Sequence, residues 1–474
     1  MNVALDATGP IRGSGRRTSP RTGPAADSAP TAPPQGAARP EPTGRLGWIV
    51  AGSLATGLLT GLLLVAAPFI PPQEGAVTGA LLCGLAVGWA MVAVLSARFT
   101  AAPQRWAVVP AAFMGLGGLL LIGFGPPARE VLSGIWPPAL FVMVVWVFVR
   151  ARRQLDSPTR HRLVYPVLVL LALSSIGGGY ETAAEAADAA AHPPPGQLID
   201  VGGHRLHLNC TGSGSPTVVL EPGGGGMSSN LGWITPGVAR ATRVCVYDRA
   251  GRGWSEPADA PQDGAQIATD LHTLLHRANV PGPYVLAGHS FGGLYVLTFA
   301  ARYPDEVAGM VLVDSTAPAA APSTAQGSSD GIDRLAALAS IPARLGLVRL
   351  VGHLFDDGLP PRAGGEVRAG TTTAGNLRST IDEYGNASAS IRQAAALSDF
   401  ADKPLVVLTA GVGHDAAWST AQNHLATLSA NSAHLVVHGA THETLVADRR
   451  HAATTARVIL QVVAAVRSGG PVPR

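Results

Sequence analysis

The chain has 474 residues, enough for two or three domains, of which 47% are hydrophobic and only 14% are charged. Soluble domains average about 25% charged residues, so we expect part of this chain to lie in lipid. The formal net charge of +3 is too small to indicate a nucleic-acid-binding surface. The cysteines form no Cys-x-x-Cys pair and no Cys/His cluster has zinc spacing, so the sequence predicts no metal site.

Residues 1–45 are rich in Pro, Ala, Gly, Ser and Arg and contain few large apolar side chains. Such a segment buries too little surface to offset its loss of conformational entropy, and we predict that it is disordered. It does not resemble a cleavable signal peptide, because the first apolar run starts too far from the N-terminus.

Five apolar stretches follow, each close to the ~20 residues that a helix needs to cross about 30 Å of hydrocarbon. They cover residues 47–67, 76–97, 107–125, 131–149 and 163–179. None carries a charge in its interior or the polar face that a helix of a soluble domain would show. We therefore predict about five transmembrane helices within residues 46–180, followed by a linker at 181–196.

The arginines predict the orientation of these helices, because cytoplasmic links are enriched in basic residues. The N-terminal segment, the link at 98–105 and the link at 150–162 are basic, whereas the links between them are not. This alternation predicts a multi-pass protein of the cell membrane with a cytoplasmic N-terminus and an extracytoplasmic domain after residue 180. Pro137 and Pro138 interrupt the fourth stretch, and the orientation would reverse if that stretch did not cross the membrane.

Residues 197–468 have a different pattern, in which short β-type runs alternate with helical runs. The runs predicted to be strands are 205–210, 217–222, 243–248, 284–288, 309–314, 404–409 and 433–438. This alternation indicates an α/β domain with a mostly parallel sheet covered by helices on both faces. Residues 315–400 interrupt it with short helical pieces, and an insertion of this length predicts a lid.

The segment Gly288-His289-Ser290-Phe291-Gly292 has the pattern Gly-x-Ser-x-Gly between a predicted strand and a predicted helix. A turn this sharp forces the serine into an uncommon backbone conformation and needs glycines around it. The hydroxyl of Ser290 is then exposed above the sheet, and the amides of the helix start favour developing negative charge.

This domain resembles the α/β-hydrolase fold superfamily of serine hydrolases in the order and spacing of its motifs. The matching segments are 220–233 for the oxyanion loop, 247–257, 288–293 for the nucleophile turn, Asp314 after the sixth strand, and 439–445 for the histidine loop. The resemblance covers residues 197–468. It implies a mostly parallel eight-stranded sheet with helices on both faces and a helical lid.

The resemblance implies Ser290 as the nucleophile, activated by a histidine near the end of the chain. We favour His442, in the loop after the last strand, over His438, which lies within the predicted strand. His289, beside the serine, is expected to contribute packing only.

The acid that orients the histidine is implied at one of two positions. The superfamily usually places it after the seventh strand, where Asp415 lies, and less often after the sixth, where Asp314 lies. We favour Asp415 and retain Asp314 as the alternative. His414, next to Asp415, is expected to be exposed.

The oxyanion donors implied by the resemblance are the backbone amides of Phe291 and Gly224. The oxyanion loop departs from the superfamily, since it begins Pro222-Gly223 where His-Gly is usual, and it lacks a side chain that often braces the loop.

The fold also makes the strands of Cys210 and Cys245 neighbours, and outside the membrane these thiols can form a disulfide or remain buried and free. Cys83 lies in a predicted span and is expected to be free.

Together these features predict a membrane-anchored serine hydrolase, carboxylesterase- or lipase-like, that cleaves an ester or amide through an acyl-serine and needs neither cofactor nor metal. The expected partners are a small acyl substrate and the lipid bilayer, with no nucleic acid and no recognisable protein partner. The alternatives are an aminopeptidase-like enzyme, a haloperoxidase- or lyase-like enzyme, and a non-catalytic ligand-binding protein. A transporter is disfavoured because the spans lack buried charges.

Overall fold

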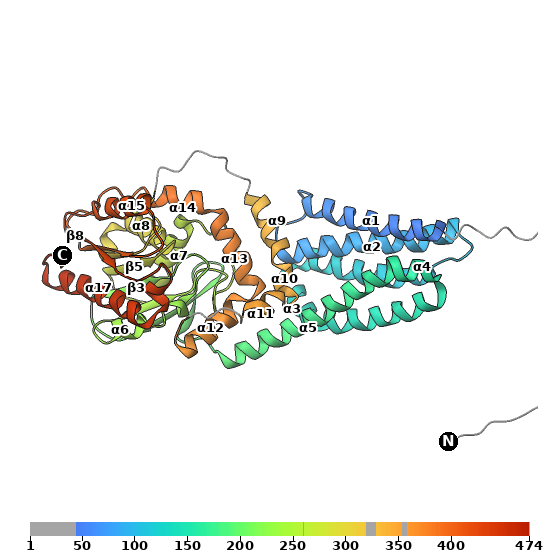
Figure 1. The fold of residues 1–474 in the computed structure, drawn as a ribbon, viewed down its shortest axis with the longest axis horizontal. Helices are drawn as coiled ribbons and strands as arrows, with labels where there is room; N and C mark the ends of the chain where they lie inside the picture. The colour runs from blue at the N-terminus through green and yellow to red at the C-terminus, as the bar shows by residue number, and fades with distance from the viewer. Residues whose placement is uncertain (1–43, 259, 319–328, 353–357, 474) are drawn as a thin grey trace, which may run out of the picture. The chain divides into compact units, whose positions relative to one another are not determined.

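The computed structural model describes residues 44–258, 260–318, 329–352 and 358–473, all within a compact unit that begins at Gly44. The predicted disordered segment 1–45 lies outside the described residues except for its last two positions. Figure 1 shows the helical region and the α/β domain that follows it.

The helical region contains five stretches that are long and apolar enough to cross a membrane, as predicted: Arg45–Ala66, Glu74–Phe99, Arg105–Gly125, Val131–Gln154 and Ser157–Ala191. Its elements are α1 (Gly44–Ala66), α2 (Glu74–Phe99), η1 (Arg105–Ala107), α3 (Val108–Gln154), α4 (Ser157–Thr159), η2 (Arg160–Val164) and α5 (Tyr165–Ala191). The third and fourth stretches share α3, which is interrupted at Gly125 by a non-helical backbone (φ 56°, ψ −131°).

Two details of this region differ from the sequence prediction. Pro137 and Pro138 do not end the helix, because α3 continues to Gln154. The predicted linker at 181–196 is mostly helical, since α5 continues to Ala191. The alanine-rich run before that residue favours helix strongly, which explains the difference.

Large apolar side chains cover the outer surface of these helices. Trp48 is 81% exposed, and Leu119 and Phe124 are 65% and 68% exposed. A surface of this kind is unfavourable in water and is the surface that lipid would cover.

Glycines let α1 and α2 approach closely. A Cβ added at Gly84 would lie 2.2 Å from the backbone nitrogen of Gly61, and a Cβ added at Gly57 would lie 2.7 Å from Cα of Gly88. The glycines are spaced four residues apart on both helices, the small-residue pattern by which membrane helices pack backbone to backbone.

The α/β domain contains an eight-stranded sheet with strand order β1-β2-β4-β3-β5-β6-β7-β8. Its strands are β1 (Gln197–Asp200), β2 (Arg205–Thr211), β3 (Thr217–Glu221), β4 (Val244–Tyr247), β5 (Tyr284–His289), β6 (Val307–Val313), β7 (Leu405–Ala410) and β8 (Ser432–Val437). The pairings β1–β2 and β2–β4 are antiparallel and all others are parallel, which confirms the mostly parallel sheet. The seven strand runs read from the sequence are present, whereas β1 is short and mostly exposed and shows no apolar pattern that would predict it.

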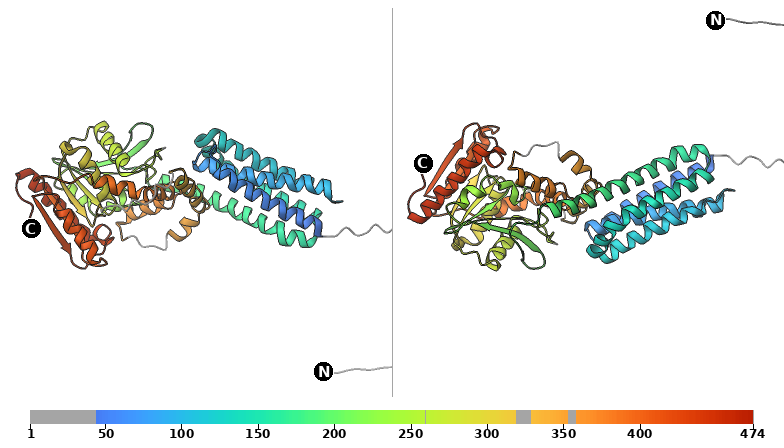
Figure 2. Two further views of the ribbon diagram at one scale, coloured as in Figure 1. Left: turned by 90° about the horizontal axis from the view of Figure 1, so that it is seen from above. Right: turned by 90° about the horizontal axis from the view of Figure 1, so that it is seen from below.

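Helices cover both faces of the sheet, as predicted. The remaining elements outside the lid are η3 (Ser228–Leu231), α6 (Thr235–Ala239), α7 (Gly264–Arg277), α8 (Gly292–Arg302), η4 (Pro304–Glu306), α15 (Ala416–Ala426), α16 (Thr444–Ala447) and α17 (Arg449–Ser468). Apolar residues of α7 and α8 pack into one core cluster, and those of α6 and α17 pack into another. The ribbon views show helices on both sides of the sheet (Figures 1 and 2).

The lid segment (residues 315–400) lies between β6 and β7. Its described helices are α9 (Ser329–Ala339), α10 (Ile341–Arg344), α11 (Leu347–Gly352), α12 (Pro361–Thr371), α13 (Ala374–Gly385) and α14 (Ala387–Ala394). Arg344 forms an ion pair with Glu74 of α2, with 2.6 Å between Nε and Oε1, and Arg349 forms ion pairs with Glu181 and Asp188 of α5. The lid segment is therefore bonded to α2 and α5.

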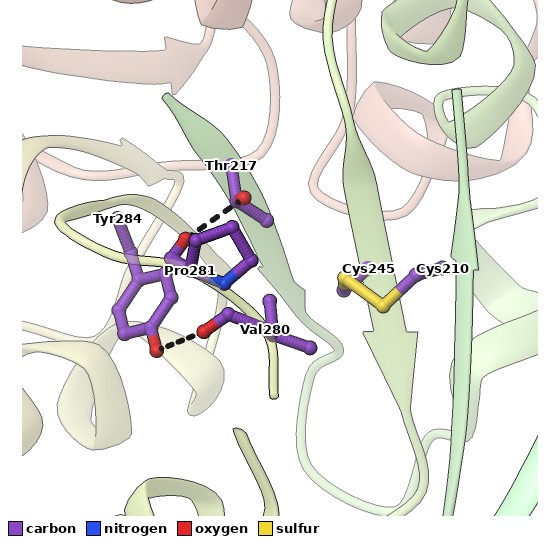
Figure 3. Close-up of a disulfide and its surroundings, with 6 residues drawn as sticks. All are labelled: Cys210, Thr217, Cys245, Val280, Pro281 and Tyr284. Carbon is purple, nitrogen blue, oxygen red and sulfur yellow. Dashed lines mark hydrogen bonds between the residues drawn. A yellow bond between two sulfur atoms is a disulfide. The ribbon is translucent and has the colours of Figure 1, made fainter. Parts of the chain in front are cut away.

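Cys210 of β2 and Cys245 of β4 are opposite each other in the antiparallel pair and are joined by a disulfide (Figure 3). Beside it, the hydroxyls of Thr217 and Tyr284 donate hydrogen bonds to the carbonyls of Pro281 and Val280, at 3.1 and 2.9 Å, and so fix the loop that enters β5 (Figure 3).

The contact between α1 and α2 predicts that Gly84→Val destabilises the helical region by roughly 1–3 kcal/mol, because the new side chain overlaps the backbone of α1. Gly52→Val on the same helix pair is the matched control, since a Cβ there meets no atom within 4 Å. Thermal unfolding of the purified protein in detergent measures both effects. Equal melting temperatures for the two variants would show that the close contact does not contribute to stability.

Candidate active site

Ser290 lies at the sharp turn between β5 and α8 and has a φ of 55°. A Cβ at Gly288 would lie 2.5 Å from the carbonyl oxygen of Gly292, and a Cβ at Gly292 would lie 2.6 Å from the carbonyl oxygen of Glu221. Only glycine fits at these two positions. The uncommon backbone conformation predicted for this serine is therefore present.

The parallel register of the sheet brings the other candidate residues to the same edge. His289 is paired with Val313, so Ser290 and Asp314 are the first residues after two neighbouring strands. The amide of Asp314 in turn donates a hydrogen bond of 2.6 Å to the carbonyl of Leu408 in β7. The loops after parallel strands meet at one edge of a sheet, where α/β proteins commonly bind their ligands.

Asp314 is fully buried and accepts hydrogen bonds from several groups. Its Oδ2 lies 2.6 Å from Nδ1 of His442 and 2.7 Å from Nε2 of His414, while Oδ1 accepts from Nε1 of Trp418 and the amide of Ala410. Burial alone would raise the pKa of Asp314, but these hydrogen bonds outweigh it and the pKa lies below its ordinary value. The carboxylate is therefore ionised at neutral pH.

The carboxylate beside His442 is that of Asp314, the retained alternative, and not that of Asp415, the favoured position. Asp415 is exposed at the N-terminus of α15, where its side chain accepts a hydrogen bond of 2.8 Å from the amide of Trp418. Capping the free amides of a helix start is a common structural role for aspartate. The expectation that His414 is exposed was wrong, since its ring stacks on Trp418 and contacts Asp314.

His289 does more than fill space. Its ring centroid lies 4.6 Å from that of His442, and its Nε2 lies 3.1 Å from the carbonyl oxygen of His442. Burial lowers the pKa of His289 to about 4, so this ring is neutral at neutral pH. His289 thus holds the loop that carries His442. His438, the histidine that the sequence disfavoured as the base, is exposed beyond the end of β8.

The oxyanion loop (residues 222–226) is braced from two sides. The resemblance gives Arg249, after the fourth strand, a bracing role, whereas the second partner, Glu383, was not predicted. Arg249 donates to the carbonyls of Pro222 and Gly223, at 2.9 and 2.7 Å. The amide of Gly225 donates to a carboxylate oxygen of Glu383 at 2.9 Å, and Glu383 comes from α13 of the lid segment. These contacts take the place of the missing bracing side chain.

Arg249 and Glu383 belong to a buried ionic network. Arg249 bridges Glu221 and Glu383, at 2.5 and 3.0 Å, and Glu383 also binds Arg252 and the hydroxyl of Tyr295. Burial alone would raise the pKa of Glu383, but the two arginines outweigh it and lower that pKa. At Glu221 burial dominates and raises the pKa to about 7. Removing one member of such a network would leave the others as unpaired buried charges.

The two residues predicted as oxyanion donors, Gly224 and Phe291, lie next to each other. A Cβ at Gly224 would lie 3.4 Å from Cβ of Phe291 and 2.7 Å from the hydroxyl oxygen of Tyr384. Within the described part of the chain, neither the Gly224 amide nor the Phe291 amide donates a hydrogen bond. Both amides therefore remain available to a ligand next to Ser290.

His414, His442 and Asp314 are also of the types that bind metals, and their ligand atoms lie within 4.8 Å of one another. Two hydrogen bonds to the same carboxylate oxygen account for this arrangement without a metal.

The geometry of the network predicts that Glu383→Ala destabilises the α/β domain by about 3–5 kcal/mol, because buried Arg252 loses its carboxylate partner and Arg249 loses one of its two. A loss of this size lowers the melting temperature by about 10 °C. Glu256→Ala, which removes a partly exposed ion pair with Arg205, is the control and should change the melting temperature little. Equal melting temperatures for Glu383→Ala and Glu256→Ala would show that the buried network does not stabilise the domain.

Comparison with known proteins supports the architecture described above. Residues 216–339 match the family model of the alpha/beta hydrolase fold. An uncharacterized protein of Schizosaccharomyces pombe is 35% identical over 151 residues, which are 26% of this chain and 28% of that protein. A 2-hydroxymuconate semialdehyde hydrolase of a Pseudomonas species is 33% identical over 126 residues, which are 26% of this chain and 44% of that enzyme. The chain thus spans less than half of the length of these relatives.

Among solved structures, the enol-lactonase of Burkholderia xenovorans is 19% identical, with a TM-score of 0.43. The match covers 56% of this chain and 100% of that structure.

Proposed function

We propose that the protein is a membrane-anchored serine hydrolase that cleaves an ester or amide bond, because residues 216–339 match the alpha/beta hydrolase family model and the eight-stranded sheet is mostly parallel. The observation that carries the proposal is the pairing of His442 with buried Asp314 at the sheet edge where Ser290 projects from its turn. A serine hydroxyl needs such a base to become a nucleophile.

In the first half of the reaction, the Ser290 oxygen attacks the carbonyl carbon of the substrate while His442 takes the hydroxyl proton on Nε2. The amides of Phe291 and Gly224 stabilise the negative charge that develops on the carbonyl oxygen. The tetrahedral intermediate then expels its alcohol or amine, which receives the proton from His442. The product that remains on the enzyme is an acyl-serine.

In the second half, His442 removes a proton from water as the water oxygen attacks the acyl carbon. The intermediate collapses to the carboxylic acid, and Ser290 regains its proton from His442. Asp314 holds the Nδ1–H of His442 throughout and stabilises the cationic ring. The lowered pKa of Asp314 suits this role, since the carboxylate stays ionised.

The partial match to a 2-hydroxymuconate semialdehyde hydrolase supports hydrolysis over ligand binding without catalysis. An ester is favoured over an amide because the apolar helices place the enzyme where acyl lipids are abundant.

The five apolar helices are proposed to anchor the enzyme in the cell membrane, with the hydrolase domain on the extracytoplasmic side. The distribution of arginines supports this orientation. The disulfide between Cys210 and Cys245 agrees with it, because disulfides persist in oxidising compartments.

The assignment of the acid gives a direct test of the mechanism. Asp314→Asn is expected to lower kcat for a short-chain p-nitrophenyl ester by about 10³–10⁴-fold, because His442 loses the partner that fixes its tautomer. Asp415→Asn should retain nearly full activity, since asparagine also caps helices. The comparison uses steady-state hydrolysis by the full chain in detergent, with Ser290→Ala as the inactive reference.

Full activity of Asp314→Asn together with strong loss in Asp415→Asn would overturn the assignment of the acid. Unchanged hydrolysis by Ser290→Ala would reject the serine mechanism altogether.

A further inference from the structure

Two histidines one helical turn apart face a glutamate on the surface of the α/β domain. His272 and His276 lie on α7, and Glu306 ends η4 just before β6. Residues four apart on a helix project from the same face, so both imidazoles point toward one region. None of these residues belongs to the site proposed for hydrolysis.

The three side chains converge at the spacing of metal ligands. Nδ1 of His272 lies 3.0 Å and Nε2 of His276 lies 3.1 Å from the same oxygen, Oε1 of Glu306. A tetrahedral Zn²⁺ ion with bonds of about 2.0–2.1 Å separates its ligand atoms by about 3.3 Å. Small side-chain shifts would bring this cluster to that separation.

Hydrogen bonding does not fully account for the arrangement. Among the described residues, Nδ1 of His272 makes no hydrogen bond despite its proximity to Glu306, and Oε2 of Glu306 makes none either. Both atoms are buried, and a buried polar atom without a partner is costly. An ion shared by the ring nitrogen and the carboxylate would give both atoms a partner.

Neighbouring contacts hold the ligands in place. The ring of His272 stacks on Tyr303, with 4.1 Å between centroids and 6° between planes. The amide of Glu306 donates a hydrogen bond of 3.1 Å to the carbonyl of Tyr303. Tyr303 thus positions His272 of α7 through its ring and Glu306 of η4 through its backbone carbonyl. A preformed site of this kind loses less conformational entropy on binding.

We propose that His272, His276 and Glu306 bind one divalent first-row transition-metal ion, with water in the remaining coordination position. Two imidazole nitrogens and one carboxylate oxygen form a donor set that suits Zn²⁺ better than Mg²⁺ or Ca²⁺. The ion links α7 to the segment that enters β6, so binding would stabilise the fold. The proposal does not depend on the proposed hydrolysis.

The experiment is calorimetric titration of Zn²⁺ into the EDTA-treated, dialysed full chain in detergent. We expect one equivalent to bind in the micromolar range and affinity to fall at least tenfold in His276→Ala and in Glu306→Gln. His424→Ala removes an exposed helical histidine outside the cluster and should bind as the unmodified chain does. His442→Ala should also retain binding, which separates this site from the histidines around Asp314.

Visible absorption of added Co²⁺ gives an independent readout, because tetrahedral nitrogen and oxygen coordination produces a strong band that His276→Ala should lose. Melting temperatures in EDTA check that each variant is folded. Zn²⁺ affinity that is unchanged in both His276→Ala and Glu306→Gln would overturn the proposal. So would binding that is lost only in His442→Ala.

Discussion

The candidate site depends on one buried carboxylate, Asp314. It accepts hydrogen bonds from His442 after β8, from His414 and Trp418 after β7, and from the amide of Ala410. A buried carboxylate is stable in its ionised form only while such donors are in place. The loops after two strands must therefore adopt their observed positions around Asp314, and the strand register puts this assembly beside the Ser290 turn.

The lid segment is part of the site's architecture rather than only a cover. Glu383 on α13 binds the Gly225 amide and Arg249, and Arg249 holds the carbonyls on the other side of the same loop. The same segment is bonded through Arg344 and Arg349 to α2 and α5. The conformation of the oxyanion loop is thereby linked to elements that are distant in sequence.

Local patterns in the sequence predicted the elements that depend on local physics. The apolar stretches, the runs of β2 to β8 and the Ser290 turn each follow from residue spacing. The sequence left Asp314 and Asp415 as alternatives, because which carboxylate pairs with His442 depends on how the loops close in space. Glu383 was missed for the same reason, since it lies far from Arg249 in the sequence and the two meet only in the fold. The His272–His276 spacing was visible, but its third partner, Glu306, becomes apparent only in the structure.

The proposed mechanism is tested most directly by covalent labelling of Ser290 with a membrane-impermeant fluorophosphonate, with the adduct located by peptide mass spectrometry. We expect an adduct on Ser290 in intact cells that express the chain, and much slower labelling in His442→Ala. Labelling that occurs only after permeabilisation would indicate that the hydrolase domain lies on the cytoplasmic side, and it would still support Ser290 as the nucleophile. If Ser290 stayed unlabelled in permeabilised cells although the protein was folded, the catalytic account would be contradicted.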